Sequence, residues 1–370
     1  MAKDKDKARE RAEAKAKELE AVTPFEFNPP PEDFLSSGCT LLNVAVSKHA
    51  DRCVPKGTYL YIVGTSGSGK TWWCFTFLAE AARNKHFKDY RFVYDNVENG
   101  ALMDVAKHFG SQVLKRLERP AEGDSPCSTT VKEFYLNVEA NTRKGPCIYI
   151  LDSMDGLTDD TQDEVFEAEL KNHLGGSEKV PGSMGMGKAK TNSQNIGRLA
   201  RNLRTSGSIL VIISQTRQNL KSSWGGNTRA GGDALMFYSH VNVWLKTTGK
   251  ITRNYLGKER EIGDTVQLDV RKNRITGWEG KLEVPFLKDH GPDDVGSCVD
   301  YLIEEDVFKK MKLSRGTGIR AEAFDFEGSR EGLVKAIQDQ NREAELAKMC
   351  AELWVSIEEG AKLERKPKYL

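Results

Sequence analysis

Short apolar runs that alternate with helical stretches are the feature that most limits the folds open to this 370-residue chain. Residues 147–151 and 209–213 are nearly continuous apolar runs of strand length, as expected for strands buried on both faces of a parallel sheet. The other elements predicted in this region are strands over residues 58–63 and 91–94 and helices over residues 70–82 and 102–109. Such alternation is typical of an α/β fold in which helices connect parallel strands.

The pattern changes in the second half of the chain. Strand-like segments at residues 241–245, 266–270 and 281–284 follow one another with little helix between them. We therefore expect the mostly parallel sheet to end in antiparallel strands. Residues 299–303 and 331–358 have the pattern of helices and indicate a small C-terminal module.

The first 35 residues differ in composition from the rest. Residues 3–20 alternate Lys or Arg with Asp or Glu, which fits either a solvated, partly disordered arm or a helical arm that docks on a neighbouring subunit. Four prolines within residues 23–33 exclude a helix and indicate a linker. We expect an arm with its linker at 1–35, an α/β core at 36–287 and a C-terminal domain at 288–370.

Composition indicates in which compartment the protein works and how it could bind nucleic acid. No apolar stretch approaches the roughly 18 residues needed to cross a bilayer, and the N-terminus is too charged for a signal peptide. The seven cysteines show neither a CxxC pair nor metal-ligand spacing, so we expect buried, reduced thiols in a cytoplasmic protein. The net charge is +1, so any binding of nucleic acid must depend on local basic loops.

A phosphate-binding motif follows the first predicted strand. The pattern G-x-x-x-x-G-K-[ST] is matched at every position by Gly64, Thr65, Ser66, Gly67, Ser68, Gly69, Lys70 and Thr71. Its glycines let the backbone wrap a phosphate, and the next helix points its N-terminus at the same anion. Lys70 is expected to reach the β- and γ-phosphates and Thr71 to ligate Mg²⁺. ATP is favoured over GTP because Asn84-Lys85 is not followed by the Asp of an Asn-Lys-x-Asp motif.

Acidic residues at strand ends complete the expected site. Asp152 follows the apolar residues 148–151, in a pattern whose carboxylate orients Mg²⁺. Glu98 follows the second strand, and parallel sheets bind ligands at the carboxyl ends of their strands. We favour Glu98 over Asp95 as the base that positions water, the alternative being that Glu98 only caps the next helix.

Three further motifs, in this order, make the chain resemble the bacterial RecA family, including phage RecA/UvsX-type recombinases. They are Ile212-Ile213-Ser214-Gln215-Thr216-Arg217, Ala230-Gly231-Gly232-Asp233-Ala234-Leu235-Met236-Phe237-Tyr238 and Val270-Arg271-Lys272-Asn273-Arg274-Ile275. The resemblance covers residues 36–290. It begins at Ser37-Gly38-Cys39-Thr40-Leu41-Leu42, which resembles the family's S/T-G-x-x-x-L-D motif, although Asn43 replaces the Asp. It implies a RecA-like P-loop NTPase that uses ATP and Mg²⁺, forms a helical filament on single-stranded DNA, and promotes homologous pairing and strand exchange.

The resemblance also implies roles for single residues. Glu98 matches the catalytic glutamate, and Gln215 matches the switch residue that senses the γ-phosphate. Lys272 and Arg274 match two cations that reach the γ-phosphate of the neighbouring subunit, and residues at i and i+2 of a strand point to the same face. Phe237 matches an aromatic residue of the subunit interface, although a core position would also explain it.

Two loops are candidates for binding single-stranded DNA. The first is the Gly-, Ser- and Lys-rich segment 175–191, predicted to be a mobile loop, and the second is the segment 217–229. Flexible backbone, cations and an aromatic ring suit sequence-tolerant binding along a phosphate backbone. The candidate residues are Lys179, Lys188, Lys190, Arg217, Lys221, Trp224 and Arg229. Solvated loop charge is the alternative for each lysine.

Some features depart from the family pattern. The first loop is longer, Val105 lies near the point where an aromatic residue would stack on adenine, and residues 364–368 are basic rather than acidic. These differences favour a divergent member, such as a phage-encoded one.

Two other functions stay open at this point. One is a RecA-like helicase or translocase, and the other is a nucleotide-binding recombination regulator without strand-exchange activity. The complete set of Lys70, Thr71, Glu98 and Asp152 argues against the regulator. Single-strand-binding or loader proteins are further expected partners, and no membrane partner is expected.

Overall fold

A computed structural model of the chain gives two compact units, Met1–Asp33 and Phe34–Leu370. The residues that it describes are 29–122, 127–180, 187–218, 227–229, 232–312, 317–363 and 365. The predicted arm at residues 3–20 lies outside them. In the described part of the first unit, Pro31–Asp33 forms the short 3-10 helix η1.

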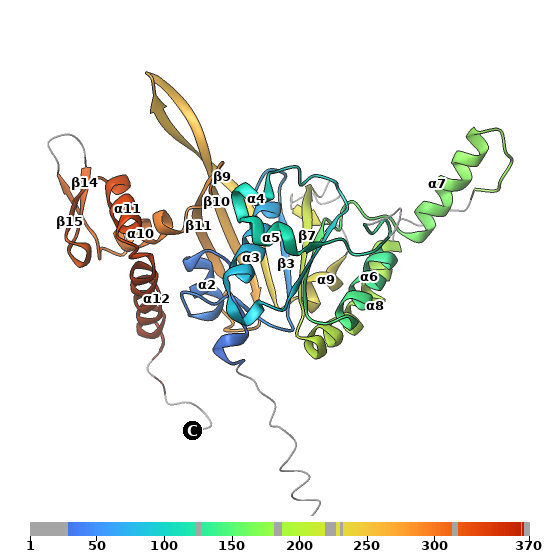
Figure 1. The fold of residues 1–370 in the computed structure, drawn as a ribbon, viewed down its shortest axis with the longest axis horizontal. Helices are drawn as coiled ribbons and strands as arrows, with labels where there is room; N and C mark the ends of the chain where they lie inside the picture. Colours follow the sequence, from blue (N-terminus) through green and yellow to red (C-terminus); the bar gives the residue numbers. More distant parts are fainter. Residues whose placement is uncertain are drawn as a thin grey trace, which may run out of the picture. The chain divides into compact units, whose positions relative to one another are not determined.

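A ten-stranded sheet forms the centre of the second unit in the described part of the chain (Figure 1). Its strands are β3 (Tyr59–Gly64), β4 (Arg91–Asn96), β5 (Leu117–Glu118), β6 (Cys147–Asp152), β7 (Ile209–Gln218), β8 (Asn227–Arg229), β9 (Val241–Tyr255), β10 (Lys258–Asn273), β11 (Gly280–Leu287) and β12 (Gly291–Pro292). The order is β12-β11-β10-β9-β3-β7-β6-β4-β5, with β8 paired to β7. Neighbours from β9 to β5 are parallel, and those from β9 to β12 are antiparallel, which confirms the predicted mixed sheet.

Helices pack on both faces of this sheet. They are α2 (Thr40–Ser47), α3 (Lys70–Arg83), α4 (Val105–Phe109), α5 (Ser111–Arg116), α6 (Val131–Arg143), α8 (Gly187–Ser206) and α9 (Asp233–Tyr238), with the 3-10 helix η2 (Lys85–Phe87) and the small strand pair β1 (Phe34–Leu35) and β2 (Val54–Pro55). Helix α7 (Asp160–His173) projects away from the sheet (Figure 1). In β3, Leu60 and Ile62 join a core cluster with α2 and α3. Tyr59, Tyr61 and Val63 alternate with them and join a second cluster with α6 and α8. This alternation explains why strands with two buried faces read as continuous apolar runs.

The C-terminal module has its own apolar core, built around Phe308, Leu333 and Cys350. Its elements are α10 (Asp294–Glu304), β13 (Lys309–Lys312), β14 (Thr317–Ala321), η3 (Glu322–Phe324), β15 (Phe326–Gly328), α11 (Arg330–Asp339) and α12 (Glu343–Gly360). Asp294 joins the module to α2, because its carboxylate accepts from the Thr40 amide at 2.6 Å and from the Thr40 hydroxyl at 3.0 Å.

Three predicted elements were wrong in extent. The helix predicted over residues 331–358 is two helices, because Asn341 takes a left-handed φ of 53° between α11 and α12. The helix predicted over 102–109 begins only at Val105, where the Asp104 side chain accepts from the Lys107 amide as its cap. The loop predicted over 175–191 ends earlier, because residues 187–190 form the first turn of α8.

Other sequence expectations agree with the structure. All seven cysteines are free, and six of them are buried. Among the described helices, none has the length and apolar character needed to cross a membrane.

Candidate nucleotide-binding site

The loop that joins β3 to α3 is shaped to hold an anion. Gly67 and Gly69 take left-handed φ angles of 75° and 83°, which residues with side chains rarely adopt. A Cβ on Gly64 would lie 2.7 Å from the Leu245 carbonyl oxygen, so this strand end needs glycine as well. Gly69 is the N-cap of α3 and offers no capping side chain, and the first turn of α3 carries no acidic residue. Its amide groups are therefore available to a phosphate.

Lys70 and Thr71 start α3 and point toward the loop and β6 respectively. The Lys70 ammonium donates to the carbonyl oxygens of Gly64 at 3.0 Å and Thr65 at 2.7 Å. The Thr71 hydroxyl donates to Asp152 Oδ2 at 2.7 Å. Burial lowers the pKa of Lys70 and raises that of Asp152. A bound cation and phosphates would offset both desolvation costs.

The Asp152 carboxylate has a second partner that sequence reasoning missed. The Tyr94 hydroxyl donates to Asp152 Oδ2 at 2.8 Å, since β4 and β6 are adjacent in the sheet. The oxygens of Thr71 and Asp152 are the hard ligands that Mg²⁺ prefers, and they lie within one coordination sphere of each other. These two residues therefore fit the predicted Mg²⁺ site.

A cleft of about 300 Å³ brings the predicted residues together. Its lining consists of Ser66, Gly67, Gly69, Lys70, Thr71, Trp72, Glu98, Met103, Asp152, Ser153, Ile213, Gln215 and Phe286. One end is polar and acidic, whereas Trp72, Met103 and Phe286 give an apolar side that suits a base or sugar. Val105 does not belong to this lining.

Glu98 lies at the polar end of the cleft and is held by two side chains. The Gln215 amide donates to both Glu98 oxygens, at 3.2 and 3.3 Å, and the Ser153 hydroxyl donates to Glu98 Oε1. The rival Asp95 is fully buried and accepts from Ser128 and from the Tyr149 hydroxyl. The geometry favours Glu98 as the base. The next helix is capped by Asp104 and not by Glu98.

Asp155 is a second residue that sequence reasoning missed. Its Oδ2 accepts from the backbone amide of Gln215 at 2.6 Å, and its own amide donates to the Ser153 hydroxyl at 3.3 Å. The Lys188 ammonium, from the first turn of α8, donates to the Asp155 carbonyl oxygen at 3.3 Å. Asp155 thus connects α8 to the residue that contacts Glu98. No sequence motif marks Asp155, because its role depends on how β7 passes beside the turn after β6.

Lys272 and Arg274 do not line the cleft of their own chain. Lys272 pairs with Asn242, which is level with Tyr61 near the start of β3, whereas the phosphate loop follows the end of β3. The Lys272 ammonium donates to the carbonyl oxygens of Met236, at 2.8 Å, and Phe237, and Arg274 also donates to Phe237 O at 2.8 Å. The core alternative for Phe237 is wrong, because its side chain is 64% exposed.

Charge and burial lower two pKa values around Lys272 and Arg274. Desolvation and the neighbouring Arg274 lower the pKa of Lys272 to about 8. Burial and the same two cations lower the pKa of His240 to about 4. Lys272 and Arg274 thus form a compact, partly desolvated patch of positive charge. An anion bound there would offset the cost of desolvation and of the repulsion between the two cations.

The candidate DNA-binding residues are only partly described. Lys221 and Trp224 lie outside the described residues. Arg217 and Arg229 belong to the antiparallel pair β7–β8, in which Arg217 pairs with Thr228 and Thr216 with Arg229. The predicted second loop therefore emerges from a hairpin whose pairing starts at Thr216, one residue after Gln215. Lys188 and Lys190 lie on α8, and Lys179 lies in the described segment before it.

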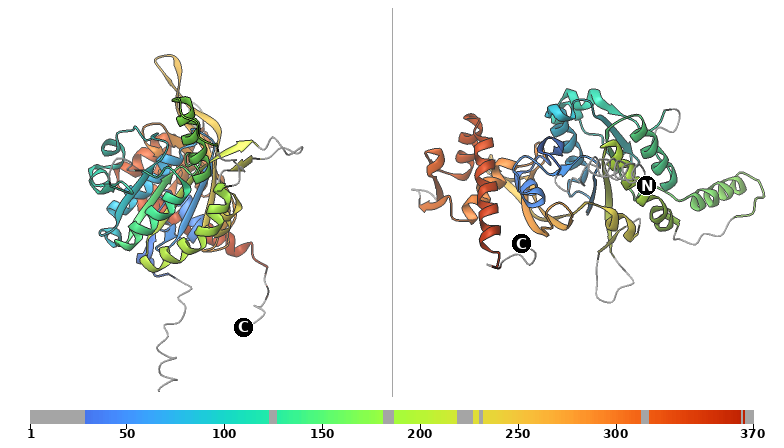
Figure 2. Two further views of the ribbon diagram at one scale, coloured as in Figure 1. Left: turned by 90° about the vertical axis from the view of Figure 1, so that its right-hand side faces the viewer. Right: turned by 90° about the horizontal axis from the view of Figure 1, so that it is seen from below.

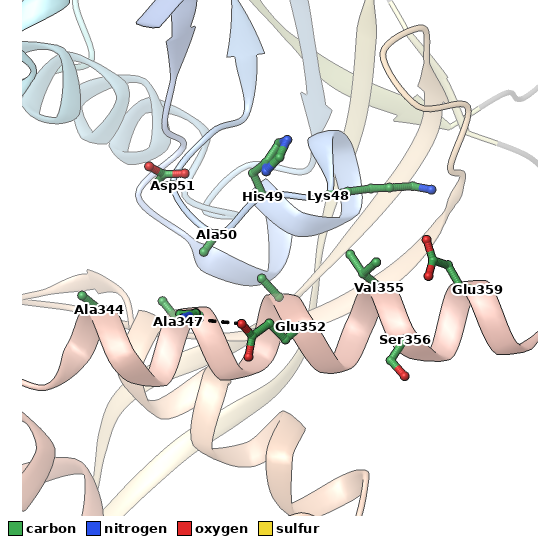
Figure 3. A pocket seen from close by; sticks show the side chains of 12 residues that line it. Lys48, His49, Ala50, Asp51, Ala344, Ala347, Glu352, Val355, Ser356 and Glu359 are labelled. Atoms are coloured by element: carbon green, nitrogen blue, oxygen red, sulfur yellow. Dashed lines mark ion pairs between the residues drawn. The ribbon is translucent and has the colours of Figure 1, made fainter. Parts of the chain in front are cut away.

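A larger hollow of about 700 Å³ lies between residues 48–51 and α12 (Figure 3). Alanine side chains and Val355 give it an apolar floor, and the Lys348–Glu352 ion pair at 3.6 Å lies on its rim. None of the predicted site residues lines it. The phosphate cleft, although smaller, is the one with convergent catalytic chemistry.

The fold and the cleft together are those of a P-loop nucleoside triphosphatase. A family model described as the RecA N-terminal domain matches residues 30–291, and the chain belongs to the RecA family. At the level of the family, it is a P-loop ATPase of DNA recombination and repair, and the family uses ATP and Mg²⁺.

Proposed function

We propose that this chain is an ATP-dependent DNA recombinase that polymerises on single-stranded DNA and promotes homologous pairing and strand exchange. The observation that carries the proposal is the separation of two half-sites. The phosphate loop, Glu98 and Gln215 form one half at the end of β3. Lys272 and Arg274 form the other half, level with the start of β3, where they have no nucleotide of their own to contact.

Two copies of the chain would complete the site. If chains stack head to tail, the cations of one chain can reach the γ-phosphate held by the next, and such an open contact propagates into a filament. The exposed Phe237 lies beside both cations and would be buried in the same contact. Cations supplied in trans stabilise the charge that develops during phosphoryl transfer.

Within one chain, Gln215 can report the state of the nucleotide. Its amide donates to Glu98 here, and a γ-phosphate oxygen would compete for the same donor. Because β7 continues from Gln215 into the hairpin with β8, a change at Gln215 would move the base of the predicted DNA-binding loop. Nucleotide state and DNA affinity would be coupled in this way.

The hydrolytic step follows from the same residues. The loop amides and Lys70 would hold the phosphates, and Thr71 with Asp152 would hold the Mg²⁺ that neutralises phosphate charge. Glu98, once released from Gln215, would accept a hydrogen bond from the attacking water and orient it. The Ser153 hydroxyl donates to Glu98 and keeps the carboxylate at the mouth of the cleft.

The test is ATP turnover with and without single-stranded DNA, with electron microscopy and a strand-exchange assay on the same sample. Stimulation by DNA, helical filaments and joint-molecule formation are expected together. Closed rings with directional unwinding would favour the helicase, and turnover that does not respond to DNA, without strand exchange, would favour the regulator.

A further inference from the structure

Helix α7 projects from the body of the molecule (Figure 2), and three of its apolar side chains are exposed. The side chains of Phe166 and Leu174 are 63% and 76% exposed, and Leu170 lies between them. Residues four apart share one face of a helix, so the three form a continuous apolar stripe. Contiguous exposed apolar side chains are typical of interaction surfaces.

Acidic residues border this stripe. At about 100° per residue, Glu167 and Glu169 lie on opposite sides of it. Glu164 points to the far side of the helix. The one lysine of α7, Lys171, is already paired with Glu178 at 3.1 Å. The partner of this face must therefore be apolar at its centre and basic at its edges.

The hairpin of β9 and β10 carries a surface of that description. Beyond Leu245 the two strands continue past β3 and project from the sheet (Figure 1). Arg253 lies directly opposite Arg260, and Tyr255 lies opposite Lys258. Like charges at directly opposed positions destabilise a hairpin. An anionic partner would remove that cost.

The two faces of the hairpin differ in charge. On one face Lys250 pairs with Glu261 at 3.0 Å and with Asp264 at 2.7 Å, so its charges are balanced. The other face, here termed the basic ribbon face, consists of Ile251, Arg253, Tyr255, Lys258, Arg260 and Ile262. Both strands of the hairpin are fully described, and this face has no carboxylate.

The basic ribbon face continues into a groove of about 700 Å³ beside α11. Ile251 and Ile262 line the groove together with Pro285, Leu287 and Val334. Asp293 and Asp300 also line it, and Arg330 offsets their charge at 3.8 and 2.5 Å. Exposed Glu331 and Lys335 lie on its α11 side. The groove therefore adds apolar area rather than net positive charge.

We propose that α7 of one chain docks on the basic ribbon face of a second copy. Its apolar stripe would cover Ile251, Ile262 and the groove, while Glu167 and Glu169 would meet Arg253 and Arg260. A nucleic-acid backbone would satisfy the cations but would leave the apolar side chains exposed, so the protein helix is the better fit. The contact joins two different surfaces and rests on the proposed head-to-tail polymer.

Charge reversal on the full chain tests the contact. Glu167→Lys with Glu169→Lys, or Arg253→Glu with Arg260→Glu, should each raise the protein concentration needed for assembly about tenfold. The four substitutions combined in one chain should restore it to near the wild-type value. Matched controls are Glu164→Lys, on the far side of α7, and Glu259→Lys, on the balanced face of the hairpin. Assembly would be followed by light scattering and sedimentation with a slowly hydrolysed ATP analogue, with and without single-stranded DNA.

Each outcome decides the question. Loss in both paired variants with recovery in the combined chain supports the contact. Unchanged assembly, or loss without recovery, overturns it, as does an Arg253→Glu/Arg260→Glu chain that loses only DNA affinity. If the wild type assembles and responds to DNA while every variant does too, the recombinase proposal stands and the docking contact falls. If the wild type never assembles, both fall. Basal ATP turnover checks that each variant is folded.

Discussion

The nucleotide cleft and the Lys272–Arg274 patch are built from the same sheet but differ in completeness. In the cleft, Lys70, Thr71, Asp152, Glu98 and Gln215 contact one another or the loop through hydrogen bonds within one chain. At the patch, two cations donate to carbonyl oxygens at the end of α9, and the Lys272 ammonium lies 5.6 Å from the centre of the exposed Phe237 ring. On the proposed function, the cleft binds the nucleotide and the patch completes the cleft of a neighbouring chain.

On the proposed function, this separation would keep a single chain inactive until it assembles. The cleft would bind nucleotide and orient water, whereas Lys272 and Arg274, which would stabilise the transition state, do not line it. Rapid hydrolysis would then depend on a neighbouring chain. Predictions that separate the two regions therefore test the proposal most directly.

The largest effect is expected from removing the patch. A chain with Lys272→Ala and Arg274→Ala should lose about 10³-fold in DNA-stimulated turnover, as other enzymes do without a cation supplied in trans. It should still bind nucleotide with nearly unchanged affinity, because its cleft is intact. Turnover and the binding of a fluorescent ATP analogue are the two measurements.

Mixing two inactive variants tests whether the patch of one chain acts on the cleft of another. A Lys70→Ala chain has a defective cleft and an intact patch, so equal amounts of the two inactive chains should recover about a quarter of wild-type turnover if neighbours are random. A mixture with a chain that carries all three substitutions should recover nothing. Recovery in neither mixture would show that the patch acts within its own chain or not at all.

The next effect concerns Glu98. Glu98→Gln keeps the shape and the contact with Ser153 but cannot act as a base, so turnover should fall about 10²-fold while nucleotide binding and assembly remain. Single-turnover hydrolysis and sedimentation with ATP are the measurements. Asp95→Asn is the matched control for hydrolysis, and because Asp95 is buried in hydrogen bonds it should change stability instead. A larger catalytic loss from Asp95→Asn than from Glu98→Gln would reverse the assignment.

The cleft was more predictable from sequence than the surfaces around it. Asp152 and Glu98 each follow a strand, and a parallel sheet brings strand ends to one edge, so their position follows from local pattern. Tyr94 and Asp155 were missed because their contacts depend on which strands become neighbours. A tyrosine inside an apolar strand resembles a core residue. The Tyr94 hydroxyl donates a hydrogen bond to Asp152 only because β4 lies beside β6.

Helices with polar or interrupted sequences were the least predictable elements. The acidic sequence of α7 precedes a glycine-rich segment, and its apolar residues at four-residue spacing, Phe166, Leu170 and Leu174, are too few to mark a core helix. The break at Asn341 was missed because both flanking helices have helix-forming sequences and only residues 340–342, of which Asn341 is left-handed, separate them. The register that places Lys272 level with Tyr61 depends on three register shifts between β9 and β10, two with an extra residue in β10 and one with an extra residue in β9, which no local sequence rule predicts.

A smaller effect is expected at Asp155, which connects the cleft to α8. Asp155→Ala removes the acceptor for the Gln215 amide and should lower the ratio of DNA-stimulated to basal turnover about tenfold. Asp155→Asn keeps an acceptor oxygen and should restore much of the ratio. Asp163→Ala removes a comparable hydrogen bond, to the Thr158 hydroxyl, at a site away from Gln215 and serves as the control. A purely structural role would change the melting temperature but not this ratio.

The finest separation of the two regions uses pH. Because the pKa of Lys272 is lowered to about 8, its side chain is charged below that pH and loses its charge as the pH rises through it. DNA-stimulated turnover should therefore decline above about pH 8, and Lys272→Arg should move the decline to higher pH because a guanidinium stays charged. Stability should change in the opposite direction, since the unfolded chain binds the proton more tightly and the free energy of unfolding rises between pH 8 and the ordinary lysine range. Turnover that falls while the melting temperature holds or rises would assign the decline to lost charge at the patch. An unchanged decline in Lys272→Arg would place the titrating group in the cleft instead, and would remove the reason for treating the two regions as halves of one site.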